Sequence, residues 1–247
     1  KWAKHLQLLS FFGRLNYTLM DRYLFTFTVR GDASSRFSKD NRWGVFPAAA
    51  LAWKITDEAW MKNVKNVMNE MKLRLGWGVT GQQDIGDSYY PYLATYVASV
   101  QGSNYPSLSG NGFISTMYPT GYDPKLKWEE TTTWNAGFDF AFLNNRITAS
   151  IDYYLRKSKD LLSYVSVPSG SSTTNMMNQN IGTLKNEGIE FSITARPIVT
   201  NDFTWTASYN VAYNKNRITK LNNDGSYIET GAISSGNGNN CQVQAVG

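Results

Sequence analysis

The sequence is poor in the residues on which most catalytic and metal sites depend. It has one cysteine, Cys241, and one histidine, His5, in 247 residues. One cysteine excludes an intrachain disulfide, and one histidine excludes histidine-based metal clusters and most catalytic triads. Glu129 and Glu130 are adjacent carboxylates, but in a strand they point to opposite faces and cannot act as a catalytic couple. The sequence therefore predicts neither an enzyme nor a cofactor or metal site.

Charge and long hydrophobic runs are also scarce. Charged residues make up 17% of the chain, and the net charge of +5 comes from Lys and Arg that are scattered along the sequence. Without a basic patch, a nucleic-acid partner is not expected. The longest apolar run, residues 45–53, is far shorter than the roughly 20 residues that a membrane-spanning helix needs.

One glycine-rich motif imitates a cofactor site. Gly76, Gly78 and Gly81 have the spacing of the dinucleotide-binding fingerprint, and they follow a predicted strand. That chemistry requires a helix to begin at the motif, so that its N-terminus meets the pyrophosphate. No helical periodicity follows Gly81, so we interpret these glycines as space-leaving positions on the inner face of a strand.

Aromatic residues and a two-residue periodicity are what the sequence has in abundance. Aromatics reach 14%, with 8 Trp and 15 Tyr. In the segment around residue 26, for example, Tyr23, Phe25 and Phe27 alternate with residues of the opposite face. The same alternation predicts eight strands: residues 11–19, 23–30, 43–53, 72–79, 133–142, 147–155, 189–195 and 203–213. None of their apolar-face positions carries a charge.

The connections between these segments differ strongly in length. Those at residues 20–22, 144–145 and 197–202 are short, whereas those at 33–42, 81–130 and 157–188 and the stretch after 219 are long. Short turns at one end and long loops at the other are typical of an outer-membrane barrel, whose strands cross the bilayer in about ten residues. Aromatics near the short-turn ends, such as Tyr17, Trp53 and Trp205, fit an interfacial girdle. The runner-up is a soluble all-β carbohydrate-binding module, which would not need detergent.

Two local features test this reading. Between the third and fourth strands, residues 57–71 place Trp60, Val64 and Met68 at helical spacing, which predicts a short amphipathic periplasmic helix capped by Asp57. In the third strand, Pro47 removes a hydrogen-bond donor from the ladder, and we expect a β-bulge there.

Several segments together resemble the SusC/RagA-like family of TonB-dependent outer-membrane transporters. The resemblance covers about residues 8–221 and is carried by the runs 10–17, 22–25, 30–37, 43–48, 72–74, 78–82, 144–147, 180–182 and 186–190. It implies an antiparallel transmembrane β-barrel of about 22 strands around an N-terminal plug, located in the cell outer membrane. No stretch resembles the plug, the TonB-contacting segment or the final strands, so residues 1–247 are expected to be a partial barrel domain of about eight strands.

The resemblance also implies partners. Such importers work with a SusD-like surface lipoprotein, draw energy through TonB, and import oligosaccharides or peptides across the lipid bilayer. A passive porin is a third alternative, distinguished by the absence of a plug in the full gene. The candidate contacts to substrate or partner are Arg30, Arg36, Gln82, Tyr89, Tyr90, Tyr92 and Tyr96. For the tyrosines, packing of one loop against another is an equally good interpretation. A structural expectation also follows: the first and last predicted strands do not pair, because the inner faces hold too few large residues to fill a narrow eight-stranded barrel.

Overall fold

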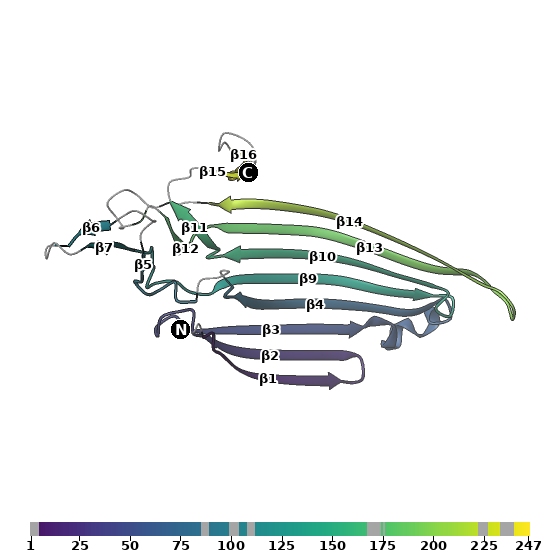
Figure 1. The fold of residues 1–247 in the computed structure, drawn as a ribbon. Helices are drawn as coiled ribbons and strands as arrows, with labels where there is room; N and C mark the ends of the chain where they lie inside the picture. Colours follow the sequence, from purple (N-terminus) through teal and green to yellow (C-terminus); the bar gives the residue numbers. More distant parts are fainter. Residues whose placement is uncertain are drawn as a thin grey trace.

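Eight long strands form one antiparallel sheet in the computed structural model, which describes residues 5–84, 89–98, 104–107, 112–166, 174, 176–221, 227–232 and 240–247. The strands lie in chain order (Figure 1). They are β1 (Leu8–Leu19), β2 (Tyr23–Ser34), β3 (Trp43–Lys54), β4 (Met68–Gln82), β9 (Glu129–Phe142), β10 (Ile147–Lys159), β13 (Thr183–Val199) and β14 (Thr204–Lys220). In the described part of the chain, no helix is long and apolar enough to cross a membrane.

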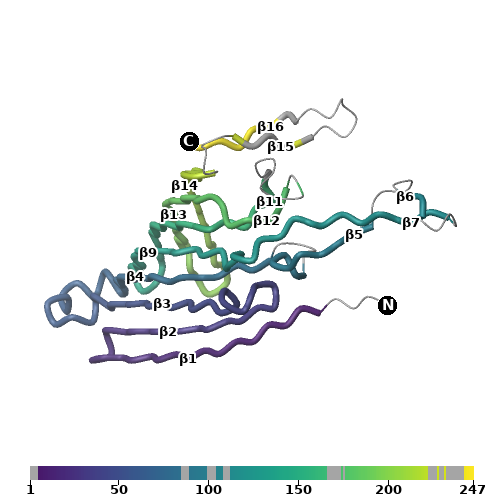
Figure 2. The backbone as a smooth tube through the Cα atoms, turned by 90° about the vertical axis from the view of Figure 1, so that its left-hand side faces the viewer, coloured from purple at the N-terminus to yellow at the C-terminus, as the bar shows by residue number. Residues whose placement is uncertain are grey.

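Shorter strand pairs project from one end of this sheet. They are β5 (Tyr96–Ala98) with β8 (Met117–Pro119), β6 (Asn104–Pro106) with β7 (Phe113–Ser115), β11 (Leu162–Ser166) with β12 (Met176–Asn180), and β15 (Ile228–Ala232) with β16 (Asn240–Gln244). Figure 2 shows β5, β6 and β7 extending well beyond the ends of the long strands. All four pairs lie at the long-loop end, as the asymmetry of the connections predicts.

One face of the sheet is apolar in every strand. Cross-strand neighbours share a face, and the row that starts at Tyr17 is apolar throughout: Tyr17, Phe25, Leu51, Leu75, Ala136, Tyr153, Ile189 and Tyr213. The parallel row on the opposite face runs through Thr26, Gly76, Asn135 and Asn214, which are small or polar. Among the described residues, no second sheet packs over the apolar face. This arrangement favours a lipid-facing wall over a soluble sandwich.

The apolar band crosses the hydrogen-bonded rows obliquely. Leu19, at the short-turn end of the band in β1, belongs to the row that ends at Val211. Val211 lies near the long-loop end of an alternating apolar run that begins at Phe203, just before β14, and extends along this strand. An offset of this kind arises because barrel strands tilt about 35–45° from the membrane normal.

The short turns contain consecutive residues with a left-handed backbone. Asn144 and Asn145 have φ of 57° and 61°, and Arg146 N donates to Leu143 O at 3.2 Å. Positive φ at both central residues gives the turn a twist that matches the flanking strands, and asparagine adopts it more readily than most residues. The turn between β1 and β2 has the same geometry at Met20 and Asp21. The predicted position of both turns is confirmed.

The connection between β3 and β4 is helical, as predicted, but the helix is of the 3₁₀ type and is shorter than residues 57–71. It consists of two short segments, η1 (Ile55–Asp57) and η2 (Ala59–Val64), and Asp57 ends η1 instead of capping a helix. Met68 and Met71 belong to β4. The helical spacing was only apparent, because Trp60 and Val64 belong to the 3₁₀ connection and Met68 and Met71 to the alternating strand that follows it.

The bulge expected at Pro47 is also wrong. Pro47 pairs with Val29 without a shift of register, and the ladder from β3 to β4 begins only at Ala48 and Gly78. Residues 43–47 therefore behave as an edge strand towards β4, where a missing donor is tolerated. A register shift occurs instead between Ala195 and Ile198, around Pro197 of β13.

The sheet does not close on itself. In the described residues β1 pairs only with β2, and β14 pairs only with β13. The expectation that the first and last strands do not pair with each other is confirmed.

Candidate functional site: lumen wall and outer rim

A small hydrophobic core anchors the outer rim where β3 and β4 separate. Phe37, Phe46, Leu126 and Trp128 are buried together, and the Trp128 ring lies 5.4 Å from Phe37 and 5.3 Å from Phe46. A Cβ atom on Gly44 of β3 or on Gly81 of β4 would collide with the Phe46 ring, so this ring spans the gap between the two strands. Gly81 therefore serves packing, and because it alternates with the outward positions, the interpretation of all three glycines as inner-face positions is wrong for Gly81. β4 runs through Gly76, Gly78 and Gly81 as a strand and does not turn into a helix.

The candidate residues Arg36, Gln82 and Arg30 lie on the same rim in different environments. Arg36 is 8% exposed, and its Nη1 donates to Oδ1 of Asp84 at 2.8 Å, while its Nε has no hydrogen-bond partner among the described residues. Gln82 accepts hydrogen bonds through Oε1 from the backbone N–H groups of Gln83 and Asp84. Arg30 is half-exposed and paired with Asp32 at 2.7 Å. Arg36 thus ties the loop after β2 to the end of β4, and Arg30 presents its guanidinium to the surface.

The candidate tyrosines divide into two groups. Tyr89, Tyr90 and Tyr92 are half-buried near the base of the long loop, where Tyr90 Oη donates to the carbonyl of His5 at 3.1 Å. Tyr96 lies on β5, is 67% exposed, and pairs with Pro119. The structure therefore brings Tyr90 against another segment of the chain and leaves Tyr96 on the projecting arm.

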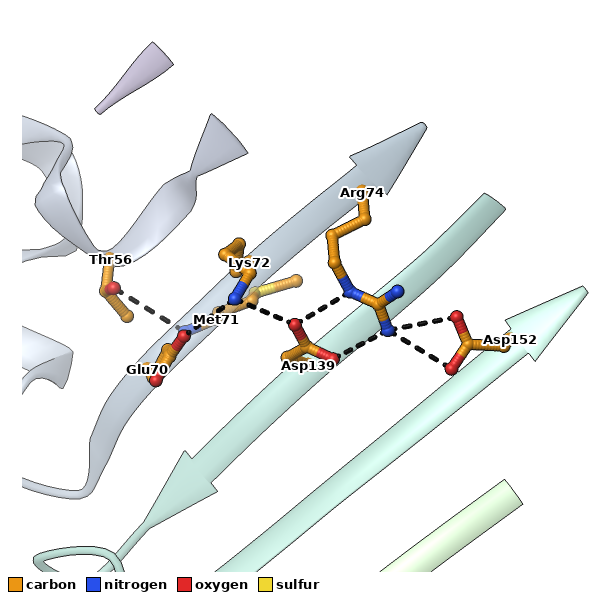
Figure 3. Close-up of polar contacts among 7 residues, drawn as sticks. All are labelled: Thr56, Glu70, Met71, Lys72, Arg74, Asp139 and Asp152. Atoms are coloured by element: carbon orange, nitrogen blue, oxygen red, sulfur yellow. Dashed lines mark hydrogen bonds and ion pairs between the residues drawn. The ribbon is translucent and has the colours of Figure 1, made fainter. Parts of the chain in front are cut away.

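Five charged side chains on the inner face form a continuous network (Figure 3). Arg74 of β4 is bidentate to Asp139 of β9, with both N–O distances 2.8 Å, and its Nη2 also lies 2.9 Å from Oδ1 of Asp152 of β10. Lys72 bridges Asp139 at 3.0 Å and Glu70 at 3.4 Å. Strand alternation places these side chains on one face, and the ladder puts Lys72 directly opposite Asp139.

Gly137 is the position that allows this network to span three strands. It lies between Arg74 and Asp152 in the same cross-strand row. A Cβ atom there would collide with the Asp152 carboxylate and would lie 3.0 Å from Nη2 of Arg74. The guanidinium therefore crosses β9 over a residue without a side chain. Alternation along single strands predicts Lys72, Arg74, Asp139 and Asp152 on the polar face, whereas Glu70 lies in the segment that was predicted to be helical. The pairing of these residues depends on the register between strands.

The inner face of the sheet has two depressions beside the network. A depression of about 580 Å³ runs over small residues: Ala48, Ala50 and Ala52 of β3, Gly76 and Gly78 of β4, and Gly137 of β9. A neighbouring depression of about 470 Å³ is lined by Glu70, Lys72, Asp139 and several hydroxyl side chains. In the described part of the chain, no group of three or more His, Cys, Asp or Glu side chains is placed to hold a metal ion.

Glu58 organises the short-turn end. It lies between η1 and η2 and accepts hydrogen bonds from Tyr23 Oη at 2.6 Å, Trp53 Nε1 at 3.0 Å and Arg22 Nη1 at 2.7 Å. The Tyr23 and Trp53 rings are stacked with centroids 6.1 Å apart. The hydrogen bond from Tyr23, supported by Trp53 and Arg22 and opposed by burial, lowers the pKa of Glu58 below its ordinary value of 4.5.

Glu58 should therefore stabilise the barrel in a pH-dependent way. Because its pKa is lower in the folded state, its contribution is complete above about pH 4.5 and is lost as the pH falls through the folded-state pKa. We expect E58Q to remove part of the acid-dependent loss of stability that the native protein shows, as measured by urea unfolding in lipid at a series of pH values. D57N is the control, because the ion pair of Asp57 with Lys65 is exposed. An unchanged pH dependence in E58Q would contradict the role of this cluster.

A sheet with one apolar face, one polar face, long loops at one end and tight turns at the other is the wall of an outer-membrane β-barrel. Residues 4–239 match the family model described as TonB dependent receptor-like, beta-barrel. The chain belongs to this family, and it is an outer-membrane protein.

The relatives agree with this assignment. The chain is 54% identical over 250 residues to TonB-dependent receptor SusC of Bacteroides thetaiotaomicron, which covers 100% of this chain and 24% of SusC. It is 40% identical over 217 residues to TonB-dependent receptor P3 of Formosa agariphila, covering 87% of this chain and 21% of that protein. The chain therefore spans about a quarter or less of the length of these curated relatives.

Solved structures share the architecture. The RagAB peptide importer in its open-open state superposes with a TM-score of 0.81 at 28% identity, over 98% of this chain and 24% of that chain. The siderophore receptor PirA of Pseudomonas aeruginosa matches with a TM-score of 0.56 at 16% identity, over 87% of this chain and 35% of that chain, a likeness of fold alone.

Proposed function

We propose that residues 1–247 form part of the barrel wall of a TonB-dependent importer that takes up oligosaccharides or peptides together with a SusD-like surface lipoprotein. Identity of 54% to SusC over the whole chain and the similarity to a peptide importer support this class of activity. Energy coupling through TonB would use parts of a longer protein outside these residues, which contribute the wall, its inner lining and the outer loops.

The observation that carries the proposal is the arm at the outer end of the wall. Its described parts, the pairs β5–β8 and β6–β7, expose aromatic and apolar side chains: Tyr96, Tyr105, Phe113, Ile114, Met117 and Tyr118. Exposed aromatic faces on a projecting loop are suited to sugar rings, to peptide side chains or to a partner protein, since a loop of this length exceeds what a connection needs. We propose that residues 82–118 contact the lipoprotein or the substrate.

Excision of residues 96–118 from the full-length protein should abolish most uptake and leave barrel assembly intact. The cut ends are adjacent, because Thr120 N donates to Thr95 O at 2.8 Å and their hydroxyl groups lie 2.6 Å apart. Growth on the cognate nutrient measures uptake, and heat-modifiable migration in gels measures assembly. Normal growth of the deletion strain would contradict the proposal.

A point variant separates recognition from loop folding. Y105S/F113S removes two exposed rings from the β6–β7 hairpin, and N104S/S115A changes a directly opposed polar pair of the same hairpin. We expect the first variant to reduce uptake and co-purification of the lipoprotein, and the second to behave like the native protein. Equal behaviour of both variants would indicate that the arm acts only through its length.

A further inference from the structure

The outward face of the sheet, which is the apolar face towards lipid, becomes basic near the long-loop ends of three neighbouring strands. In β10, Lys157 follows Leu155; in β13, Lys185 lies beyond Glu187 and Ile189; in β14, Lys215 and Arg217 follow Tyr213. These residues continue the alternation of the apolar face. They therefore point in the same direction as the side chains that face lipid.

Pairing of the strands gathers these cations, although they are far apart in the sequence. Lys157, Lys185 and Arg217 form one cross-strand row, and Leu155, Glu187 and Lys215 form the row below it. Since adjacent strands lie about 4.8 Å apart, the backbones of the three cations in one row span roughly 10 Å. The impression of scattered basic residues that the sequence gives is thus wrong for this part of the wall.

Only part of the charge in this basic patch, defined as Lys157, Lys185, Lys215 and Arg217, is neutralised by the chain itself. Lys185 Nζ lies 2.8 Å from Glu187 Oε2, and Lys157 Nζ lies 5.7 Å from the centre of the Trp134 ring. Glu187 is the one carboxylate within these two rows, whereas the nearby Lys159 is paired with Glu130 at 2.9 Å. Like charges on directly opposed strand positions repel each other, so the patch favours an external anion.

The patch is local. At the outer ends of β2, β3 and β4, the residues in register with the outward face are Ala33, Trp43 and Gly81, all uncharged. A general surplus of basic residues around the rim would not produce this difference. The concentration of cations on β10, β13 and β14 therefore indicates a ligand at one sector of the wall.

We propose that this basic patch binds a phosphate-bearing lipid headgroup of the outer leaflet. The long loops mark the outer side of the membrane, so the patch lies at the level of the headgroups there. Guanidinium and ammonium groups form charge-assisted hydrogen bonds with phosphate oxygens. Directly below the patch, Leu155, Ile189 and Tyr213 continue the apolar face, on which the acyl chains of the same lipid would lie.

The position of the patch favours a lipid over a soluble polyanion. Its side chains follow the lipid-facing side of the wall, so a nucleic acid or an acidic protein would have to displace bilayer to reach them. The inference requires only that the wall lies in the outer membrane, and it is independent of the substrate and of the lipoprotein partner. Normal uptake by the protein that lacks residues 96–118, with lipid binding intact, would therefore contradict the proposed function and leave this inference standing.

Native mass spectrometry of the full-length protein, titrated with lipid A, tests the inference, with phosphatidylcholine as the zwitterionic reference. We expect lipid A to bind more tightly than phosphatidylcholine, and K157Q/K185Q/R217Q to weaken its binding by about tenfold or more at low salt. The control K39Q/K62Q/K125Q removes three exposed lysines away from the patch and should bind as the native protein does. Unchanged affinity in the patch variant, or equal loss in the control, would overturn the inference.

Two further measurements keep the test decisive. If the triple variant does not assemble, R217Q alone changes one exposed side chain and should weaken lipid A binding by roughly threefold. Addition of inorganic phosphate should not displace lipid A from the native protein, because free phosphate has no acyl chains to hold it on the apolar face. Displacement by inorganic phosphate would identify a free anion as the ligand and overturn the lipid assignment.

Discussion

Replacing Phe27 by arginine should lower the free energy of unfolding of the full-length barrel in lipid by about 2–4 kcal/mol. Phe27 lies in the middle of the apolar face of β2, beside Leu15 and Ala49, and its side chain is 49% exposed on a surface that lipid covers. A guanidinium at this depth has no water, and its directly opposed neighbours, Leu15 and Ala49, offer no counter-charge. Urea titration of the protein folded into lipid vesicles measures the cost.

The matched controls lie on the neighbouring positions of the same strand. T28R and T26R place the same arginine on the inner face, where it reaches the lumen, and both should cost much less. Thr26 is the cleaner of the two controls, because Thr28 accepts a hydrogen bond from Arg14 and a new arginine there would lie beside an existing cation. Equal costs on the two faces would contradict the assignment of lipid and lumen sides.

Replacing Gly137 by alanine should destabilise the barrel by about 1–3 kcal/mol, although alanine is the smallest change available. The added Cβ would collide with the Asp152 carboxylate and press on Nη2 of Arg74, so the guanidinium could not bridge β4 and β10. G76A is a matched control on the same inner face, since its Cβ would meet Asn135 Cβ at an ordinary 3.7 Å. We expect G76A to be neutral or slightly stabilising.

A double-mutant cycle identifies the cause of this loss. In a D152A background the collision is absent, so G137A should cost less there than in the native protein. Urea unfolding of the four proteins in lipid gives the coupling energy. Additive effects of the two substitutions would show that Gly137 does not act by making room for the Arg74–Asp152 contact.

Alternation along single strands was enough to predict most of the wall. Phe27 and Thr28 were assigned to opposite faces because their periodicity is local, and the same holds for Arg74 and Asp139 on the inner face. What depends on register could not be predicted in this way. The bridge from Arg74 over Gly137 to Asp152 and the approach of Lys157 to Arg217 both require knowing which residues of separate strands are opposed.

The errors have equally specific causes. Met68 and Met71 suggested a helix because apolar residues at the start of a strand can fall at helical spacing when a turn precedes them. Pro47 suggested a bulge because the sequence does not reveal that the ladder between β3 and β4 begins only at Ala48. The irregularity around Pro197 lies beyond the end of the β10 ladder at Ala195, where β13 is paired with β14 alone. Among the candidate contacts, the burial of Arg36 and the exposure of Tyr96 depend on loop packing, for which the sequence has no periodic signal.

Because the apolar band runs obliquely across the sheet, the residues of a single cross-strand row lie at successively different depths in the membrane. From Leu19 in β1 to Val211 in β14, residues that are hydrogen-bonded neighbours pass from the inner interface through the midplane towards the outer interface. One substitution moved along this row would therefore report the polarity profile of the bilayer, with the largest penalty near Phe138 and Ile151. Residues of homologous barrels should therefore be compared at equal membrane depth and not along one cross-strand row. Residues of the same row lie in different environments, some at the membrane interface and others in the hydrocarbon core.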